Sequence, residues 1–270
     1  MTSIGITGTG GASHAIARAL IASNEDCEVW VWARQPERAE ACVDLLGPRA
    51  STRTLEQLAQ AQTVLLAVPD PAVGKVAAQL AEYAHGSGEQ APVALHLAGA
   101  LGVEPLQPLA DAGWETGVLH PLLAMHPDTP VPLWQGALCS ISGSALARER
   151  AQSLVHSIGA QAIELAQDQR LRYHAAAALL AQGAVALLHR SRAELLKLGL
   201  EADVARRGLS SLLTSVAVNL HSKEPREALS GPIARGDWDT VEAHREVAGP
   251  EARELQDLVR KTLEGLLAEE

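Results

Sequence analysis

Residues 3–13 read Ser3-Ile4-Gly5-Ile6-Thr7-Gly8-Thr9-Gly10-Gly11-Ala12-Ser13. The apolar run at 4–6 is typical of a buried strand, and residues 12–23 repeat apolar side chains at helical spacing. A strand that turns through glycines into a helix is a pattern that cradles the phosphates of a dinucleotide. The residues that we expect to form this cofactor-binding loop are Gly8, Thr9, Gly10, Gly11, Ala12 and Ser13.

The glycine spacing follows the Rossmann fingerprint, which places glycine at the first, third and sixth positions of the loop. Gly8 allows the tight turn, and Gly10 lets the backbone approach a pyrophosphate. Ser13 stands at the sixth position, where a third glycine would let helix and strand pack closely. A small residue can replace that glycine. The alternative is a glycine turn that binds nothing.

The end of the second expected strand indicates which nicotinamide cofactor is used. NAD-binding folds usually carry an acidic residue there for the ribose hydroxyls. Here residues 29–33 are followed by Arg34, and Arg38 lies one helical turn further on. Guanidinium groups suit phosphate oxygens, which favours NADP with its 2′-phosphate. The alternative is that both arginines are only solvated surface charges.

A later strand, expected over residues 63–68, ends in Val68 and Pro69. Ligands of such sheets lie outside the carboxyl ends of the strands. We therefore expect Val68 and Pro69 to face the ribose or the nicotinamide, with a proline-rich turn as the alternative.

The first part of the chain alternates strand-like and helical stretches, which indicates βαβ units and a doubly wound, parallel sheet. After Asp168 the pattern changes, because residues 168–198 contain no proline and are rich in alanine and leucine. One helix over this stretch would be roughly 45 Å long, and Gly199 is placed to end it. Further helices are expected at 201–219, 239–247 and 251–268, with Asp239 and Glu242 at capping-box spacing.

The expected fold is therefore α/β, with a Rossmann-type NADP-binding domain at residues 1–165 and an all-helical domain at residues 166–270. The helix at 168–198 is apolar around much of its circumference, so it must be buried on most sides. We expect a homodimer formed through this helical domain.

Composition excludes several classes of function. The 270 residues carry a formal net charge of −10 and only 3% aromatic side chains, so no nucleic-acid surface is expected. Three cysteines, Cys27, Cys42 and Cys139, lack the spacing of a disulfide framework or a zinc site. We see no membrane-spanning run and no signal peptide, and we expect a cytoplasmic protein with no membrane partner.

Several further motifs occur together along the chain. They are Ala67-Val68-Pro69-Asp70, His96 with Gly99, His120-Pro121, Tyr173-His174-Ala175-Ala176, and the run Ala-Leu-Ser-Gly-Pro-Ile-Ala-Arg-Gly-Asp at 228–237, with Asn219 and His244 beside them. In these motifs the chain resembles Rossmann-like proteins that carry the C-terminal domain of unknown function 2520. Those proteins are similar to pyrroline-5-carboxylate reductase, ketopantoate reductase and 6-phosphogluconate dehydrogenase. The resemblance covers nearly the whole chain and implies an NADP-dependent oxidoreductase with a C-terminal domain like that of 6-phosphogluconate dehydrogenase.

Three positions depart from the family pattern. Ala98 stands where the family usually has serine, and Ala181 and Gln182 stand where it usually has Ser-Asn. These changes remove polar groups from the expected cleft.

The residue that we expect to handle a proton is His174. Related dehydrogenases use a lysine on the long helix, but residues 168–196 contain none. A histidine near its ordinary pKa can donate or accept a proton at neutral pH. The alternative is a hydrogen-bonded structural histidine above an apolar face.

Asn219 and Arg235 complete the expected catalytic set. Asn219 closes the next helix and Arg235 follows a short link, so both are expected to face His174 across a cleft. Arg235 would hold an acidic substrate group, or it forms an ion pair with Asp237 while Asp237 caps a helix. The other wall of this cleft is expected to carry Gly10, Val68 and His96.

These features predict an NADP-dependent oxidoreductase that reduces a small carbonyl or imine substrate. A catalytically inactive nucleotide-binding sensor or scaffold is the alternative, favoured by Ala98, Ala181 and Gln182. A metal-dependent hydrolase is a third possibility, but no histidine and carboxylate set has ligand spacing, so no metal is expected.

Overall fold

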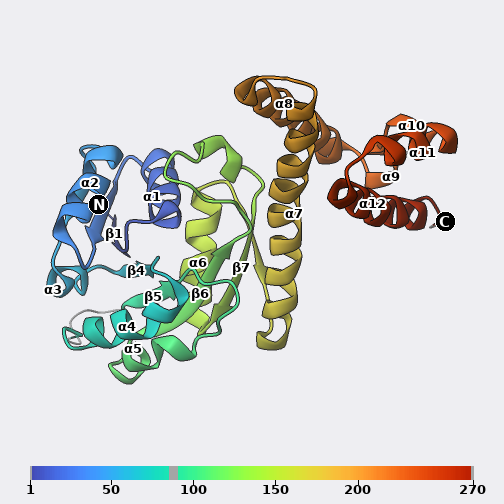
Figure 1. Cartoon of the computed structure of the whole chain (residues 1–270). Coiled ribbons are helices and arrows are strands. Elements are labelled where there is room, and N and C mark those ends of the chain that lie inside the picture. Colours follow the sequence, from blue (N-terminus) through green and yellow to red (C-terminus); the bar gives the residue numbers. More distant parts are fainter. Residues whose placement is uncertain (1, 85–90, 269–270) are drawn as a thin grey trace. The chain divides into compact units, whose positions relative to one another are not determined.

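The computed structural model describes residues 2–84 and 91–268. The chain forms two compact units, Met1–Ala177 and Ala178–Glu270 (Figure 1). The division lies further along the chain than the expected boundary at 165. The reason is that the start of helix α7 (Arg170–Lys197) packs on the first unit, where Arg170 is buried and donates a hydrogen bond to Ser142.

The first unit is built on one eight-stranded sheet in the order β3-β2-β1-β4-β5-β6-β7-β8. Its strands are β1 (Thr2–Thr7), β2 (Cys27–Trp32), β3 (Ala50–Thr52), β4 (Thr63–Leu66), β5 (Val93–His96), β6 (Glu115–Pro121), β7 (Leu138–Gly143) and β8 (Gln161–Glu164). This order reverses direction between β1 and β4, and such a switch point is where α/β sheets bind nucleotides. The expected Rossmann-type sheet is confirmed.

One pair of strands departs from the parallel arrangement. Strands β6 and β7 run antiparallel, with Leu119 opposite Ile141. Only loop and the short turn η3 (Val131–Trp134) lie between them. A parallel neighbour would need a longer crossover connection, usually a helix, to return the chain to the same edge. The short link therefore sets the direction of β7.

Helices cover both faces of the sheet, and successive side chains of β4 pack against the helices on opposite faces. Leu65 packs in the core beneath α1 (Gly11–Ser23), α2 (Pro36–Leu46) and α6 (Ala145–Ser157). Its neighbours Val64 and Leu66 pack in the other core, with α3 (Leu55–Leu58), α4 (Val73–Ala81) and α5 (Gln107–Asp111). All three side chains are fully buried, because successive residues of a strand point to opposite faces. The short turns η1 (Asp70–Ala72), η2 (Glu104–Leu106) and η4 (Gln167–Gln169) complete this unit.

The described residues of the second unit are helical and contain no strand. After α7 come α8 (Ala202–Ser222), α9 (Pro225–Ala228), α10 (Gly231–Ala234), α11 (Trp238–Val247) and α12 (Pro250–Ala268). Gly199 has a φ of +79° and follows α7, as expected for a helix end. The structure bears out the alternative in which Asp237 caps a helix, and Asp239 lies in the first turn of α11. Asp237 is the N-cap, and its carboxylate accepts from the backbone N–H of Thr240.

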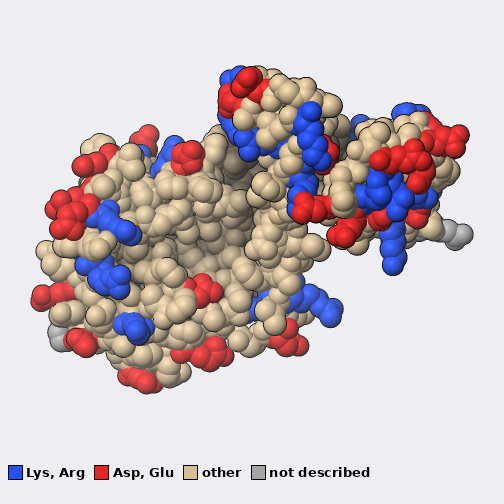
Figure 2. Space-filling model, in the orientation of Figure 1, with Lys and Arg blue, Asp and Glu red and all other residues tan. Residues whose placement is uncertain are grey.

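Helices α7 and α8 leave many large apolar side chains exposed. Leu179 and Leu180 are each 77% exposed and Val185 is 70% exposed, while Val218 of α8 is 63% exposed. By length and composition alone, Gln167–Lys197 is able to cross a membrane, with a mean hydropathy of 1.3. A single helix of this kind is weak evidence of a membrane protein, since helices of soluble proteins meet the same criteria. Figure 2 shows acidic and basic side chains interspersed over the face drawn.

Candidate functional site

The glycine loop follows β1 and is shaped by close contact with the end of β4. Gly8 has a φ of +95°, which L-residues rarely adopt, and its N–H donates to the carbonyl of Trp32. A Cβ on Gly8 would lie 2.5 Å from the carbonyl oxygen of Ala67. Only glycine therefore fits this turn, both in conformation and in space.

Gly10 lies at the N-terminus of α1 and faces open space. It is the N-cap, no side chain caps the helix, and nothing lies within 4 Å of a Cβ built there. The first backbone N–H groups of a helix have no partner within the helix and attract anions. The loop from Gly8 through Thr9 to Gly11 and Ala12 therefore has the form of a phosphate cradle.

Ser13 occupies the position of the fingerprint's third glycine. It is 1% exposed, and its hydroxyl donates to the carbonyl of Ala67 at 3.3 Å. Ser13 therefore ties α1 to the end of β4 and still leaves the helix close to the sheet. Gly11 is confined as well, because a Cβ there would clash with the carbonyl oxygen of Met125.

Arg34 and Arg38 flank the start of α2, directly beyond the carboxyl end of β2. Both are exposed, and in the part of the chain that the structure describes neither side chain has a hydrogen bond or ion pair. Their guanidinium groups are free to meet an anion. Val68 lies beside the glycine loop, with its Cγ1 3.2 Å from a Cβ built on Gly8, and Pro69 next to it is exposed.

His96 is fully buried at the end of β5, and both of its ring nitrogens are engaged. Nε2 donates to the carbonyl of Gly102 at 2.6 Å, and Nδ1 accepts from the N–H of Ala98 at 3.2 Å. Burial lowers the pKa of His96 from its ordinary value. These bonds hold the loop after β5 in place, and neither nitrogen is left for a ligand. A role in cofactor binding remains a prediction.

His174 lies in the first turns of α7, within the first unit, and faces His120 at the end of β6. The ring centroids are 5.6 Å apart at an angle of 67°. Tyr173 also contacts His120, at 6.1 Å and 83°. The buried Nδ1 of His174 has no hydrogen-bond partner among the described residues. Burial raises the pKa of Tyr173 to about 12, and a hydrogen bond with the side chain of Ser140 opposes that shift.

Arg170 lies beneath this group of rings and is 1% exposed. One guanidinium nitrogen donates to Ser142, while its Nε and Nη1 have no partner among the described residues. Burial lowers the pKa of Arg170, and the nearby carboxylate of Glu104 opposes that shift. No motif or spacing in the sequence indicates a role for Arg170. His120 and Tyr173 belong to the motifs quoted above, and a histidine before proline does not by itself indicate a site.

Asn219 and Arg235 belong to the second unit, and both are exposed. Their convergence with His174 on one cleft, opposite Gly10, Val68 and His96, therefore remains a prediction. The ion pair between Arg235 and Asp237, which was the alternative to substrate binding, is absent from the described contacts, although Arg235 helps to lower the pKa of Asp237.

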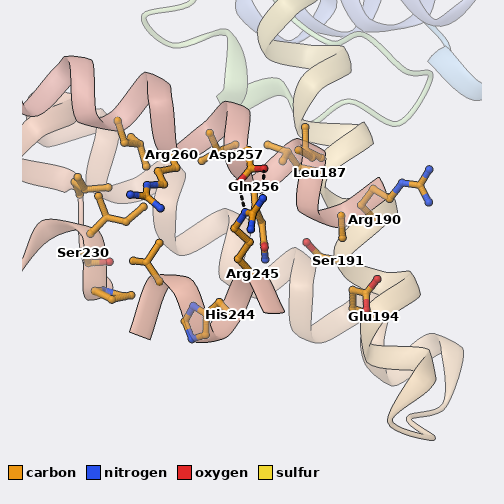
Figure 3. A pocket seen from close by; sticks show the side chains of 18 residues that line it. Leu187, Arg190, Ser191, Glu194, Ser230, His244, Arg245, Gln256, Asp257 and Arg260 are labelled. Carbon is orange, nitrogen blue, oxygen red and sulfur yellow. Dashed lines mark hydrogen bonds and ion pairs between the residues drawn. The ribbon is translucent and has the colours of Figure 1, made fainter. Parts of the chain in front are cut away.

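The second unit contains a cavity of about 350 Å³ between α7, α11, α12 and residues 229–233 (Figure 3). Its walls include Ser230 and His244 of the motifs noted in the sequence, but neither Asn219 nor Arg235. The charged side chains that line this cavity all form ion pairs, most of them with residues outside the lining. Within the lining, Arg245 donates to Asp257 at 2.8 Å.

Comparison with solved structures supports the fold. A protein from Bacteroides fragilis described as a candidate NADP oxidoreductase has a TM-score of 0.70 at 20% identity, and 97% of each chain is covered. Pyrroline carboxylate reductase from Plasmodium falciparum, solved with NADP bound, has a TM-score of 0.65 at 11% identity, covering 97% of this chain and 95% of that one.

Pyrroline-5-carboxylate reductase from Coxiella burnetii has a TM-score of 0.63 at 18% identity, covering 98% of this chain and 93% of that one. No curated protein matches the sequence. Two family models match separate parts of the chain. Residues 3–88 match the family described as NADP oxidoreductase, coenzyme F420-dependent, and residues 137–263 match the domain of unknown function 2520. The chain therefore joins an N-terminal domain of the first family to a C-terminal domain of the second, and the second is the domain that the resemblance in sequence implied.

Proposed function

We propose that this protein is an NADP-dependent oxidoreductase that reduces a small carbonyl or imine substrate. The observation that carries the proposal is the open N-terminus of α1 behind Gly10, with the unpaired Arg34 beyond the neighbouring strand β2. The match of residues 3–88 to an NADP oxidoreductase family supports it, as does the likeness to a pyrroline carboxylate reductase with NADP bound.

The residues present fit a dinucleotide with a 2′-phosphate. The backbone of the glycine loop would hold the pyrophosphate, because no side chain caps the N-terminus of α1 and the space beside Gly10 is open. Arg34 and Arg38 would hold the 2′-phosphate, and Val68 and Pro69 would flank the ribose or nicotinamide. When bound, the cofactor supplies the hydride.

The protein would supply proton transfer and substrate binding through His174, Asn219 and Arg235. We propose that His174 orients or protonates the substrate, that Asn219 donates a hydrogen bond to it, and that Arg235 holds an acidic group. The place of His174 supports this role, because its ring faces His120 at the end of β6, and ligands of such sheets lie outside the carboxyl ends of the strands. The exposure of the other two side chains leaves them available to a ligand.

Cofactor binding tests the first half of the proposal. We expect the unmodified protein to bind NADPH more tightly than NADH in a fluorescence titration. Replacing Arg34 by alanine should weaken NADPH binding by roughly 5- to 150-fold, the effect of one charge-assisted contact, and should leave NADH binding nearly unchanged. Arg49→Ala is the matched control, because Arg49 precedes β3 and bonds to the carbonyl of Asn24. Equal affinity of the unmodified protein for both cofactors would refute the preference for NADP.

Turnover tests the second half. The protein should oxidise NADPH in the presence of at least one member of a panel of keto acids and cyclic imines, and His174→Ala should abolish that turnover while NADPH still binds. Binding of NADPH without turnover on the whole panel would favour the inactive sensor or scaffold. The apolar Ala98, buried in the loop after β5, is consistent with that alternative.

We further propose that the protein is a homodimer formed through its helical unit. Exposed leucines and valines on α7 and α8 support this, because soluble monomers rarely expose large contiguous apolar surfaces. Light scattering at micromolar concentration should give the dimer mass, and replacing Leu180 by lysine should shift the population toward monomer. A monomeric mass for the unmodified protein would refute the proposal.

A further inference from the structure

His120 and His174 point their nitrogens at the same place on the loop after β5. A Cβ built on Gly99 would lie 2.6 Å from Nε2 of His120 and 2.6 Å from Nδ1 of His174. The two nitrogens are therefore no further apart than twice that distance. This separation admits either a direct hydrogen bond after a small ring rotation or one bridging water. Gly99 has to be glycine because any side chain would displace both rings.

The tautomer of His120 is set by its other nitrogen. Nδ1 of His120 lies 2.9 Å from the carbonyl oxygen of Leu97. A carbonyl oxygen can only accept, so Nδ1 carries the proton, and in the neutral ring Nε2 holds a lone pair. Nε2 of His120 is thus an acceptor that faces His174.

His174 has a ring nitrogen that lacks a hydrogen-bond partner. Its Nδ1 is buried without a partner among the described residues, and a buried polar atom left unpaired is costly. The acceptor on His120 lies within reach. An N–H at His174 Nδ1 that points to His120 would satisfy both nitrogens at once.

The surrounding charges favour a neutral His120. Burial is the main cause that lowers its pKa, and the positive charges of His174 and Arg170 act in the same direction. The bond to Leu97 and the carboxylate of Asp70 oppose this shift. Tyr173 contacts the ring by its edge. A neutral His120 keeps its Nε2 lone pair over the pH range in which free histidine gains a proton.

We propose that His120 is a positioning residue for His174, whose Nδ1–H it accepts directly or through one water. The proposal rests on the proposed role of His174 in proton transfer. Protonated His174 then carries its transferable proton on Nε2. When that N–H bond breaks, an O–H or N–H bond forms on the substrate, and His174 remains as the neutral Nδ1–H tautomer. The chain from the Leu97 carbonyl through His120 to His174 thereby fixes which nitrogen reacts.

The test is a nitrogen-15 NMR titration of the histidine side chains in the full chain without cofactor. We expect the neutral form of both His120 and His174 to be the Nδ1–H tautomer. His174 in the Nε2–H form would overturn the proposal directly, without any variant. Because this readout needs neither cofactor nor substrate, it is independent of whether NADPH binding and turnover support the proposed function.

Two substitutions at His120 separate positioning from general packing. An asparagine amide can replace the Nδ1 donor to Leu97 but offers no acceptor at the Nε2 position, whereas a glutamine amide can reach that position. His120→Asn should shift the tautomer ratio of His174 about five-fold toward Nε2–H, the effect of one ordinary hydrogen bond. His120→Gln should restore most of the original ratio. His156→Asn, on the exposed end of α6, is the control and should change nothing.

A second route covers the case in which His120→Asn does not fold. Gly99→Ala should displace the rings and shift the same tautomer ratio, because its Cβ would lie 2.6 Å from each of the two nitrogens. If His174 keeps its tautomer in every folded variant, His120 does not position it. If a reducible substrate is found, His120→Asn should change the pH profile of kcat and leave NADPH affinity unchanged.

Discussion

Gly8 and Gly10 stand two residues apart in one loop, and the structure predicts opposite consequences for replacing each by alanine. Gly8 has a φ of +95°, and a Cβ there would lie 2.5 Å from the carbonyl oxygen of Ala67. Gly10 has a φ of −82°, and a Cβ there would meet nothing within 4 Å. Gly8→Ala should therefore cost stability, whereas Gly10→Ala should cost cofactor affinity.

The magnitudes follow from these two environments. A non-glycine residue in the left-handed region costs about 1–2 kcal/mol, and forcing extra volume into a packed site costs about 1–3 kcal/mol more. Gly8→Ala should thus lower the free energy of unfolding of the first unit by about 2–5 kcal/mol. Gly10→Ala replaces an N-cap glycine and should cost at most about 1 kcal/mol. Its methyl group would enter the space that a pyrophosphate needs, and NADPH binding should weaken by about ten-fold or more.

Urea unfolding followed by tryptophan fluorescence measures the first effect, because Trp30, Trp32, Trp114 and Trp134 all lie in the first unit. Titration with NADPH measures the second. The reasoning fails if Gly10→Ala destabilises the protein as much as Gly8→Ala does. It also fails if Gly10→Ala binds NADPH as the unmodified protein does.

Three further predictions concern titration, thiol reactivity and helix capping. Burial lowers the pKa values of His96 and His120 from 6.5, so near and below that pH the unfolded chain binds more protons than the folded chain. The free energy of unfolding should therefore fall as pH drops from about 7 to about 5. Urea unfolding measured across this pH range should show a smaller fall for His96→Gln than for the unmodified protein. Burial raises the pKa of Cys139 to about 12 and that of Cys42 to about 11. Because the thiolate is the reactive form, iodoacetamide should label neither residue until the chain is unfolded. Rapid labelling of either cysteine in the native protein would contradict this. Asp237→Ala should lower the stability measured by denaturation, because it removes the cap of α11, whereas Asp237→Asn should retain most of that stability.

Much of the fold could be predicted from local pattern. The strand, glycine loop and helix at residues 3–23 form as expected, and the change to continuous helix after residue 168 is present. These features are local, because period-two and period-3.6 repeats and a glycine turn each depend on neighbouring residues. The three-residue strand β3 and the antiparallel direction of β7 were not expected. A three-residue strand is too short to show a repeat, and strand direction depends on how the chain returns to the sheet.

For the candidate site, the sequence by itself determined the loop from Gly8 to Ser13 and the arginine after β2, since both lie at fixed distances from one strand end. Tertiary structure alone decided that both ring nitrogens of His96 form hydrogen bonds with backbone groups, and that His120 faces His174 beside Gly99. These residues are far apart in the chain, on separate strands and a helix. Which nitrogen meets which acceptor is fixed only when the carboxyl ends of β5 and β6 and the start of α7 are packed together. No local repeat encodes that packing.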